Sequence, residues 1–206
     1  MVSGLVKIAN VIQQDLLSPN LLNLLSNMTK DGQWRVRMSV FELVADLAII
    51  YGKEIYSKQL QNIFMGYLTN TAASVRQMGI TKSAVLAQAF KQDWIMADYI
   101  PTVNNHFNVD KKGYNYRMCC LSSMAAVMPF IMKDQITQQI IPMFVKASKD
   151  EIPNVKFCVS KIIHQQRQFI EPNVYNNQLV VVLKEMSNDP DKDVSHFAQV
   201  ALQTSA

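Results

Sequence analysis

The sequence predicts an all-α fold, an α-solenoid of stacked antiparallel helical hairpins. Three observations lead to this prediction: a segment that recurs five times, apolar residues at helical spacing after each copy, and turn residues with the same period. A period near 40 residues is typical of paired-helix repeats. The 206-residue chain also has few turn residues, with 6 glycines and 7 prolines, whereas an all-β fold needs a turn every ~8–12 residues.

The recurring segment consists of polar turn residues, an apolar residue and, in most copies, a basic residue. Its last positions are 37, 76, 117, 156 and 195, at intervals of 39, 41, 39 and 39 residues. The copies are Trp34-Arg35-Val36-Arg37, Ala73-Ser74-Val75-Arg76, Tyr114-Asn115-Tyr116-Arg117, Pro153-Asn154-Val155-Lys156 and Lys192-Asp193-Val194-Ser195.

The second helix of each hairpin is predicted to begin at this segment. After Val36, apolar residues follow at Val40, Val44 and Leu47, a spacing that places them on one helical face. The first of these positions holds no bulky residue in any copy, which suits close helix packing. The second copy is the weakest match, because Gly79 and Ser83 occupy its first two stripe positions.

The first helix of each hairpin is predicted from the apolar stretch before each segment. Pro101 and Pro142 lie inside two of these stretches, where proline kinks a helix. The stretches are 21–28, 60–68, 100–107, 140–145 and 179–186. The turns between the helices are expected to be capped by side chains that bond nearby backbone amides, namely Asp31, Asn70, Asp110, Asp150 and Asp189.

We therefore predict one repeat array over residues 1–206. It divides into a half repeat, 1–17, and five repeats, 18–51, 52–91, 92–132, 133–170 and 171–206. The half repeat has the pattern of a second helix without its first. Because arrays end in capping repeats, either this chain is cut from a longer one or it caps itself.

Composition favours a soluble protein of the cytosol, with the nucleus as a second compartment. The chain has 20 basic and 16 acidic residues, no block of like charges, no signal peptide and no apolar run long enough to span a membrane. Cys119, Cys120 and Cys158 are odd in number and lack metal-type spacing, which predicts reduced thiols.

The sequence also predicts a protein that is not an enzyme. The histidines, His106, His164 and His196, are far apart in the sequence and have no metal-ligand spacing. The chain has neither a glycine-rich phosphate loop nor a nucleophile elbow. We therefore expect no catalytic residue, no metal and no cofactor.

The basic residues of the segment stand at helix starts, where the helix dipole disfavours a cation. Arg37, Arg76, Arg117 and Lys156 are therefore expected to bond the turn residue of their own or the adjacent repeat. The alternative is direct contact with a partner, with Arg117 the first candidate. Trp34 and Tyr114 follow polar turns; they serve either as binding residues or as packing between turns.

These strings resemble HEAT repeats, and in particular the C-terminal repeats of the protein phosphatase 2A scaffold-subunit family (the A, or regulatory 65-kilodalton, subunit). The similarity lies in Trp34-Arg35-Val36-Arg37, Tyr114-x-x-Arg117-Met118, Asn154-Val155-Lys156-Phe157 and Asp193-Val194-x-x-Phe197-Ala198-Gln199. The chain departs from the family pattern at two ridge positions, Ala73 and Ser195.

The resemblance implies a non-enzymatic scaffold whose intra-repeat turns bind a serine/threonine phosphatase catalytic subunit. A regulatory subunit would need upstream repeats that are absent from this sequence. The ridge residues carried over are Trp34, Arg35, Tyr114, Arg117, Ile152 and Asn154.

Two alternatives are a nucleic-acid-binding protein of the DNA-glycosylase type with HEAT-like repeats and a transport-type HEAT adaptor. The first needs a basic concave face. Residues predicted on the second helices, Glu42, Asp46, Lys82 and Lys161, read as charges scattered singly, which favours the scaffold over nucleic acid or membrane as a partner.

Overall fold

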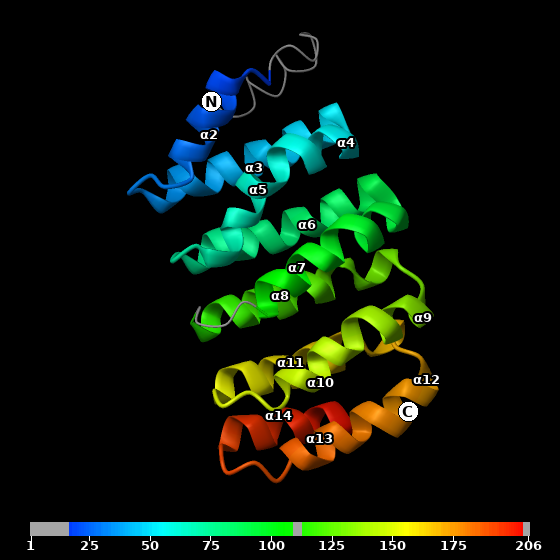
Figure 1. Cartoon of the computed structure of the whole chain (residues 1–206). Helices are drawn as coiled ribbons and strands as arrows, with labels where there is room; N and C mark the ends of the chain where they lie inside the picture. Colours follow the sequence, from blue (N-terminus) through cyan, green and yellow to red (C-terminus); the bar gives the residue numbers. More distant parts are fainter. Residues whose placement is uncertain (1–16, 109–112, 204–206) are drawn as a thin grey trace. The chain divides into compact units, whose positions relative to one another are not determined.

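The protein consists of two compact units of paired helices, Met1–Asp98 (unit 1) and Tyr99–Ala206 (unit 2). The structure, a computed structural model, describes residues 17–108 and 113–203 (Figure 1). Every regular element within these ranges is a helix, which confirms the predicted all-α class. The half repeat predicted at 1–17 and the turn residue Asp110 lie, apart from residue 17, outside the described residues.

Unit 1 contains two hairpins. Helix α2 packs against α3, and α3 packs against α6, so that second helices are neighbours in the stack. The elements are α2 (Pro19–Met28), α3 (Trp34–Tyr51), α4 (Lys53–Ile55), a π-helical segment (Tyr56–Leu60), α5 (Gln61–Phe64), a 3-10 segment (Met65–Thr69) and α6 (Ala73–Trp94).

Unit 2 contains three hairpins, with α11 packed between α8 and α14. Its first helices start with α7 (Ile100–Asn108), α9 (Lys133–Gln135) and α12 (Pro172–Val174), and its second helices are α8 (Tyr114–Val127), α11 (Pro153–Gln165) and α14 (Lys192–Gln203). The remaining elements are π-helical segments Ile136–Ile140 and Tyr175–Leu179, α10 (Ile141–Ala147), α13 (Val180–Met186), and 3-10 segments Met128–Phe130 and Arg167–Phe169. The division between the units falls inside a π-helical segment, Ile95–Tyr99.

The predicted stripe on the second helices forms the core between them. The position four residues after each segment's last apolar residue is buried in all five copies, at Val40, Gly79, Cys120, Val159 and Ala198. None of these positions carries a large side chain, and burial of this stripe drives helix stacking. The predicted register is therefore confirmed.

Gly79 does not weaken its repeat in the way its sequence suggests. A Cβ atom at position 79 would lie 2.1 Å from the ring of Tyr67, so glycine makes room for this ring. The Tyr67 hydroxyl lies 3.1 Å from Ser83 Oγ, and Ser83 donates to the carbonyl of Gly79. A fully buried tyrosine thus fills the space that the glycine leaves.

The first helices are longer than the apolar stretches indicate. Three of them begin seven residues earlier, at Lys53, Lys133 and Pro172, and each continues through a π-helical segment. The four π-helical segments begin at 56, 95, 136 and 175, at intervals of 39, 41 and 39 residues. π-Turns are rare and bend a helix.

Proline does not explain this bend in every copy. Pro101 and Pro142 follow two of the π-helical segments directly, as the kink prediction required. However, Asn62 and Val181 occupy the matching positions after the other two segments. The π-turn is therefore common to all four copies, and proline is an addition to it in two.

A four-residue spacing of buried side chains accounts for the π-turns. Neighbouring α-helical residues are ~100° apart, so a contact every four residues drifts by ~40° at each step. A wider π-turn corrects this drift and keeps the side chains on one face. The buried residues at this spacing are 56/60/64/68, 95/99/103/107, 136/140/144/148 and 175/179/183.

Sharp breaks separate a second helix from the next first helix in unit 1. Gly52 ends α3 with φ 85° and ψ 170°, and Lys91 interrupts α6 with φ 68° and ψ 177°. Side chains rarely adopt this conformation, which costs about 1–3 kcal/mol outside glycine. The predicted repeat boundaries at 51/52 and 91/92 lie beside these breaks, and the division into repeats stays a prediction.

Candidate protein-binding turn edge

The turns of each unit are closed by one side chain that accepts a bond from the backbone two residues later. Asp31 accepts from Gln33 N (2.7 Å), Asn70 from Ala72 N (3.1 Å), Asp150 from Ile152 N (2.9 Å) and Asp189 from Asp191 N (3.0 Å). This confirms the predicted capping role for the four described turns. We call these turns, with the helix ends beside them, the turn edge: residues 27–37 and 69–77 in unit 1, and 113–117, 146–156 and 184–195 in unit 2.

In unit 2, the basic residue of each segment pairs with the carboxylate of the following turn. Arg117 donates from Nε and Nη2 to the two oxygens of Asp150, at 2.6 and 2.8 Å. Lys156 pairs in the same way with Asp189, and this bond holds the pKa of Asp189 below its ordinary value. The predicted bonds between adjacent repeats are confirmed here, and they join consecutive turns.

In unit 1, the corresponding contact is between neutral and charged groups. Arg37 donates to Asn70 Oδ1 from Nε (3.4 Å) and Nη2 (3.2 Å), and from Nη2 to Thr71 Oγ1 (3.4 Å). Its Nη1 donates to the carbonyls of Asp31 (2.6 Å) and Gly32 (3.2 Å). The five N–H donors of the guanidinium thus all meet uncharged oxygens.

Two of the predicted binding residues, Trp34 and Arg35, lie at the turn edge of unit 1. They are the first residues of α3, directly after the turn that Asp31 closes. The Arg35 guanidinium lies 4.6 Å from the centre of the Trp34 ring, a cation–π distance. Trp34 is half-buried and Arg35 is exposed, so both remain accessible from solvent.

The other four predicted residues lie at the turn edge of unit 2. Tyr114 is 40% exposed and Asn154 is exposed, whereas Ile152 is half-buried. Arg117 is linked to Ile152 through Asp150, which accepts both the Arg117 guanidinium and the Ile152 amide. The structure therefore brings Arg117 and Ile152 together around one carboxylate.

A cluster of aromatic and basic side chains on α11 and α14 was missed by the sequence analysis. Lys161 Nζ lies 4.7 Å from the centre of the Phe157 ring and 4.0 Å from that of Phe197. The two rings are 5.7 Å apart. The 40-residue separation of the phenylalanines is the signal that could have indicated this contact.

The charges on α3 and α6 are not scattered singly, contrary to the sequence analysis. Lys82 Nζ lies 2.6 Å from Asp46 and 3.7 Å from Glu42. The helical period had been applied within each helix but not between adjacent ones. The three side chains form an ion cluster with one excess negative charge, so this part of the second-helix surface is not basic.

The titratable groups of the core are held by burial and hydrogen bonds. Burial raises the pKa of Cys158 to about 11, so this thiol stays protonated at neutral pH. Burial also raises the pKa of Tyr116, whose hydroxyl is hydrogen-bonded to His106. Within residues 17–108 and 113–203 no group of three or more His, Cys, Asp or Glu residues is placed to hold a metal ion.

A search for membrane-spanning helices gave a negative result in the same ranges. None of the helices described there has both the length and the apolar character needed to cross a bilayer.

Stacked hairpins joined turn to turn define a helical-repeat protein of the α-solenoid class. The crystal structure of Cex1p has the same fold, with a TM-score of 0.66 and 13% identity over 98% of this chain and 38% of that chain. A computationally designed armadillo repeat protein aligns over 98% of this chain and 90% of its own, with 16% identity and a TM-score of 0.43.

In sequence, the chain is similar to the PP2A protein phosphatase regulatory protein of the A type from Saccharomyces cerevisiae. The two are 26% identical over 125 residues, which cover 57% of this chain and 19% of the yeast protein. The match thus spans about one fifth of the length of that relative. It confirms the resemblance found in the sequence. No family model matches the chain.

Proposed function

We propose that this chain is a non-enzymatic scaffold module that binds a serine/threonine phosphatase catalytic subunit through its turn edge. The observation that carries the proposal is the similarity to the yeast PP2A regulatory protein over 57% of the chain. The free, buried cysteines are consistent with a reducing compartment, the cytosol or nucleus.

The geometry of the turn edge supports this proposal. Trp34, Arg35, Tyr114 and Asn154 are at least partly accessible on turns whose backbone is fixed by side-chain caps. Tryptophan, tyrosine and arginine dominate the energetics of protein interfaces. A surface that is already ordered before binding also loses less entropy when a partner docks.

Arg117 and Ile152 have a second role in the proposed interface. The bidentate pair between Arg117 and Asp150 fixes the turn that carries Ile152 and Asn154. Arg117 would therefore position this turn for the partner as well as lining the interface. Ile152, half-buried, supplies an apolar contact beside the polar Asn154.

The test is calorimetric binding of the purified chain to a phosphatase 2A catalytic subunit. Trp34→Ala should weaken binding by about 2 kcal/mol or more, as loss of a hot-spot residue does, and should leave the melting temperature nearly unchanged. Ile49→Ala is the matched control, since Ile49 is 40% exposed on the same helix. It lies ~22 Å along the helix from Trp34, so its removal should not affect binding.

Two other outcomes would redirect the proposal. A large fall in the melting temperature of Trp34→Ala would assign this ring to packing between turns. Salt-dependent binding to duplex DNA, without binding to the phosphatase, would favour the nucleic-acid alternative. A regulatory subunit is expected not to bind the isolated chain.

A further inference from the structure

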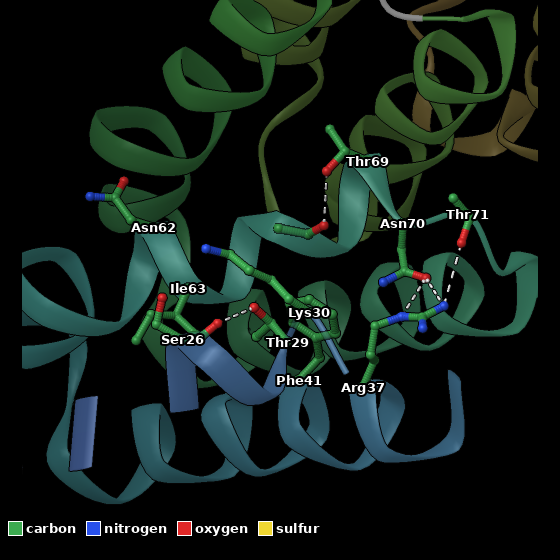
Figure 2. Close-up of a pocket in the computed structure, with 11 residues that line it drawn as sticks. Ser26, Thr29, Lys30, Arg37, Phe41, Asn62, Ile63, Thr69, Asn70 and Thr71 are labelled. Carbon is green, nitrogen blue, oxygen red and sulfur yellow. Dashed lines mark hydrogen bonds between the residues drawn. The ribbon is translucent and has the colours of Figure 1, made fainter. Parts of the chain in front are cut away.

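A polar pocket opens at the turn edge of unit 1, between two consecutive hairpins. It has a volume of about 520 Å³ and is lined by parts of α2, α3, α5 and the turn after the 3-10 segment (Figure 2). Its polar residues include Ser26, Lys30, Arg37, Asn62, Asn70 and Thr71, and Phe41 contributes an apolar wall. Among the described residues that line it, none is an aspartate or glutamate.

The Arg37 guanidinium brings a positive charge that its neighbours do not neutralise. Its hydrogen bonds go to two carbonyls, the Asn70 amide oxygen and the Thr71 hydroxyl. The nearest turn carboxylate, Asp31, uses Oδ1 to accept from the Gln33 amide and does not line the pocket. The cation is therefore held in place while its electrostatic field extends into the pocket.

The bonds of Arg37 also fix which way Asn70 faces. Asn70 Oδ1 accepts from Arg37 Nε, Arg37 Nη2 and the Ala72 amide. Figure 2 shows the amide nitrogen of Asn70 pointing away from Arg37. An asparagine oriented in this way presents two N–H donors. The Thr71 hydroxyl, which accepts from Arg37, keeps its own proton for donation.

Lys30 adds a second cation on the other side of the pocket. It is exposed, and its amino group has no ion pair within the described part of the chain. The charge of the whole turn edge is consistent with this: unit 1 carries four basic residues (Lys30, Arg35, Arg37, Arg76) against one acidic residue, Asp31. Two cations and several neutral donors without a carboxylate match the hydrogen-bonding needs of an oxyanion.

We propose that this pocket binds an oxyanion with the charge of phosphate, either free phosphate or a phosphate monoester. The Lys30 amino group, the Asn70 amide and the Thr71 hydroxyl donate to its oxygens, and Arg37 supplies the fixed positive field. The site is separate from the proposed phosphatase interface and does not depend on it.

The test uses the full chain in chloride buffer, titrated with inorganic phosphate and separately with phosphoserine. Binding is measured by calorimetry and by the side-chain amide resonance of Asn70. We expect this resonance to shift with either probe. Tighter binding of phosphoserine would identify a monoester as the ligand, and equal binding would identify the free anion.

Variants separate the pocket from general charge effects. Asn70→Asp keeps the turn cap, as at positions 150 and 189, but removes the amide donor and neutralises Arg37. Lys30→Gln removes a donor and a charge. Each should weaken phosphate binding on the order of ten-fold or more, since charge-assisted bonds are lost. Lys58→Gln, an exposed lysine outside the pocket, removes the same charge and should change binding less than two-fold, roughly a screening effect.

Three results would overturn the proposal. They are no phosphate-dependent shift of Asn70, unchanged affinity in Asn70→Asp, or equal losses in Lys30→Gln and Lys58→Gln.

Discussion

The turn edges of the two units use the same backbone geometry but differ in charge. In unit 2 a cation meets the carboxylate of the next turn, as Arg117 meets Asp150. In unit 1 the cation Arg37 meets the amide of Asn70. The described turn edge of unit 2 has six basic and six acidic residues, whereas that of unit 1 has four and one.

This difference shows that one contact between turns can serve two purposes. With a carboxylate, the contact is neutral and stabilises the stack. With an amide, the geometry is kept but one positive charge is left for a ligand. A single oxygen-to-nitrogen replacement at the turn position therefore separates a structural contact from a candidate binding pocket.

The largest effect is expected where the units differ in the core. Gly79→Ala should destabilise unit 1 by about 3 kcal/mol, because the new methyl group meets the Tyr67 ring. Helix propensity alone predicts the opposite sign, a gain of about 1 kcal/mol. Trp34 and Trp94 both lie in unit 1, so urea denaturation followed by tryptophan fluorescence reports this unit.

The matched change in unit 2 is Cys120→Ala, at the same stripe position. It removes one sulfur atom from a fully buried site and should cost about 1 kcal/mol. In a Tyr67→Leu background, the penalty of Gly79→Ala should largely disappear. A Gly79→Ala protein more stable than the wild type would show that Tyr67 does not need the space.

The second effect is on the charged contact of unit 2. Asp150→Asn makes the contact with Arg117 resemble that of Arg37 with Asn70. It should lower the free energy of unfolding by about 1–2 kcal/mol, since a charge-assisted pair becomes a neutral one. The measurement is urea denaturation followed by circular dichroism. Equal stability of the two proteins would mean that the charge contributes nothing to the contact.

The reverse change, Asn70→Asp, should stabilise unit 1 slightly. A new ion pair with half-buried Arg37 is expected to add about 0.5 kcal/mol, and more at low salt. The same variant should lose phosphate binding, so stability and binding move in opposite directions. Loss of stability would show that an aspartate at this position does not keep the geometry of Asn70.

The smallest effect is a pH dependence confined to unit 2. The Lys156 bond lowers the pKa of Asp189 in the folded state, so the unfolded state binds more protons as the carboxylate titrates. The stabilisation is therefore present above the unfolded value, about 3.9, and is lost as pH falls through the folded pKa. The stability difference between wild type and Asp189→Asn should shrink below pH ~4. A difference that is constant from pH 7 to the acid limit would contradict this.

The sequence predicted the fold class, the helix stripe and the bonds between turns, because each depends on residue type at a fixed period. Asp150 and Asp189, for example, both cap their own turn and pair with the preceding cation. The candidate interface was predicted only as positions, since exposure of Tyr114 or Trp34 depends on how neighbouring turns pack.

The rest could not be obtained from period alone. The π-helical segments require side chains every four residues rather than every 3.6 on average, and this small difference was not distinguished within the apolar stretches. Gly79 was interpreted alone, whereas its role depends on Tyr67, twelve residues earlier. Asn70 was grouped with the aspartates as a turn cap, so the loss of one negative charge at the pocket was not recognised.

The π-helical segments determine where this chain tolerates changes in length. A one-residue deletion within Tyr56–Leu60 would restore a regular α-helix and rotate every later residue of that helix by ~100°, which would turn the buried face outward. The one unequal interval between consecutive π-helical segments, 41 rather than 39, arises between Phe107, near the end of α7, and Arg117, in the first turn of α8, while the four-residue spacing is unchanged. Insertions and deletions in related chains should therefore be found between the helices and be absent from the first half of each first helix.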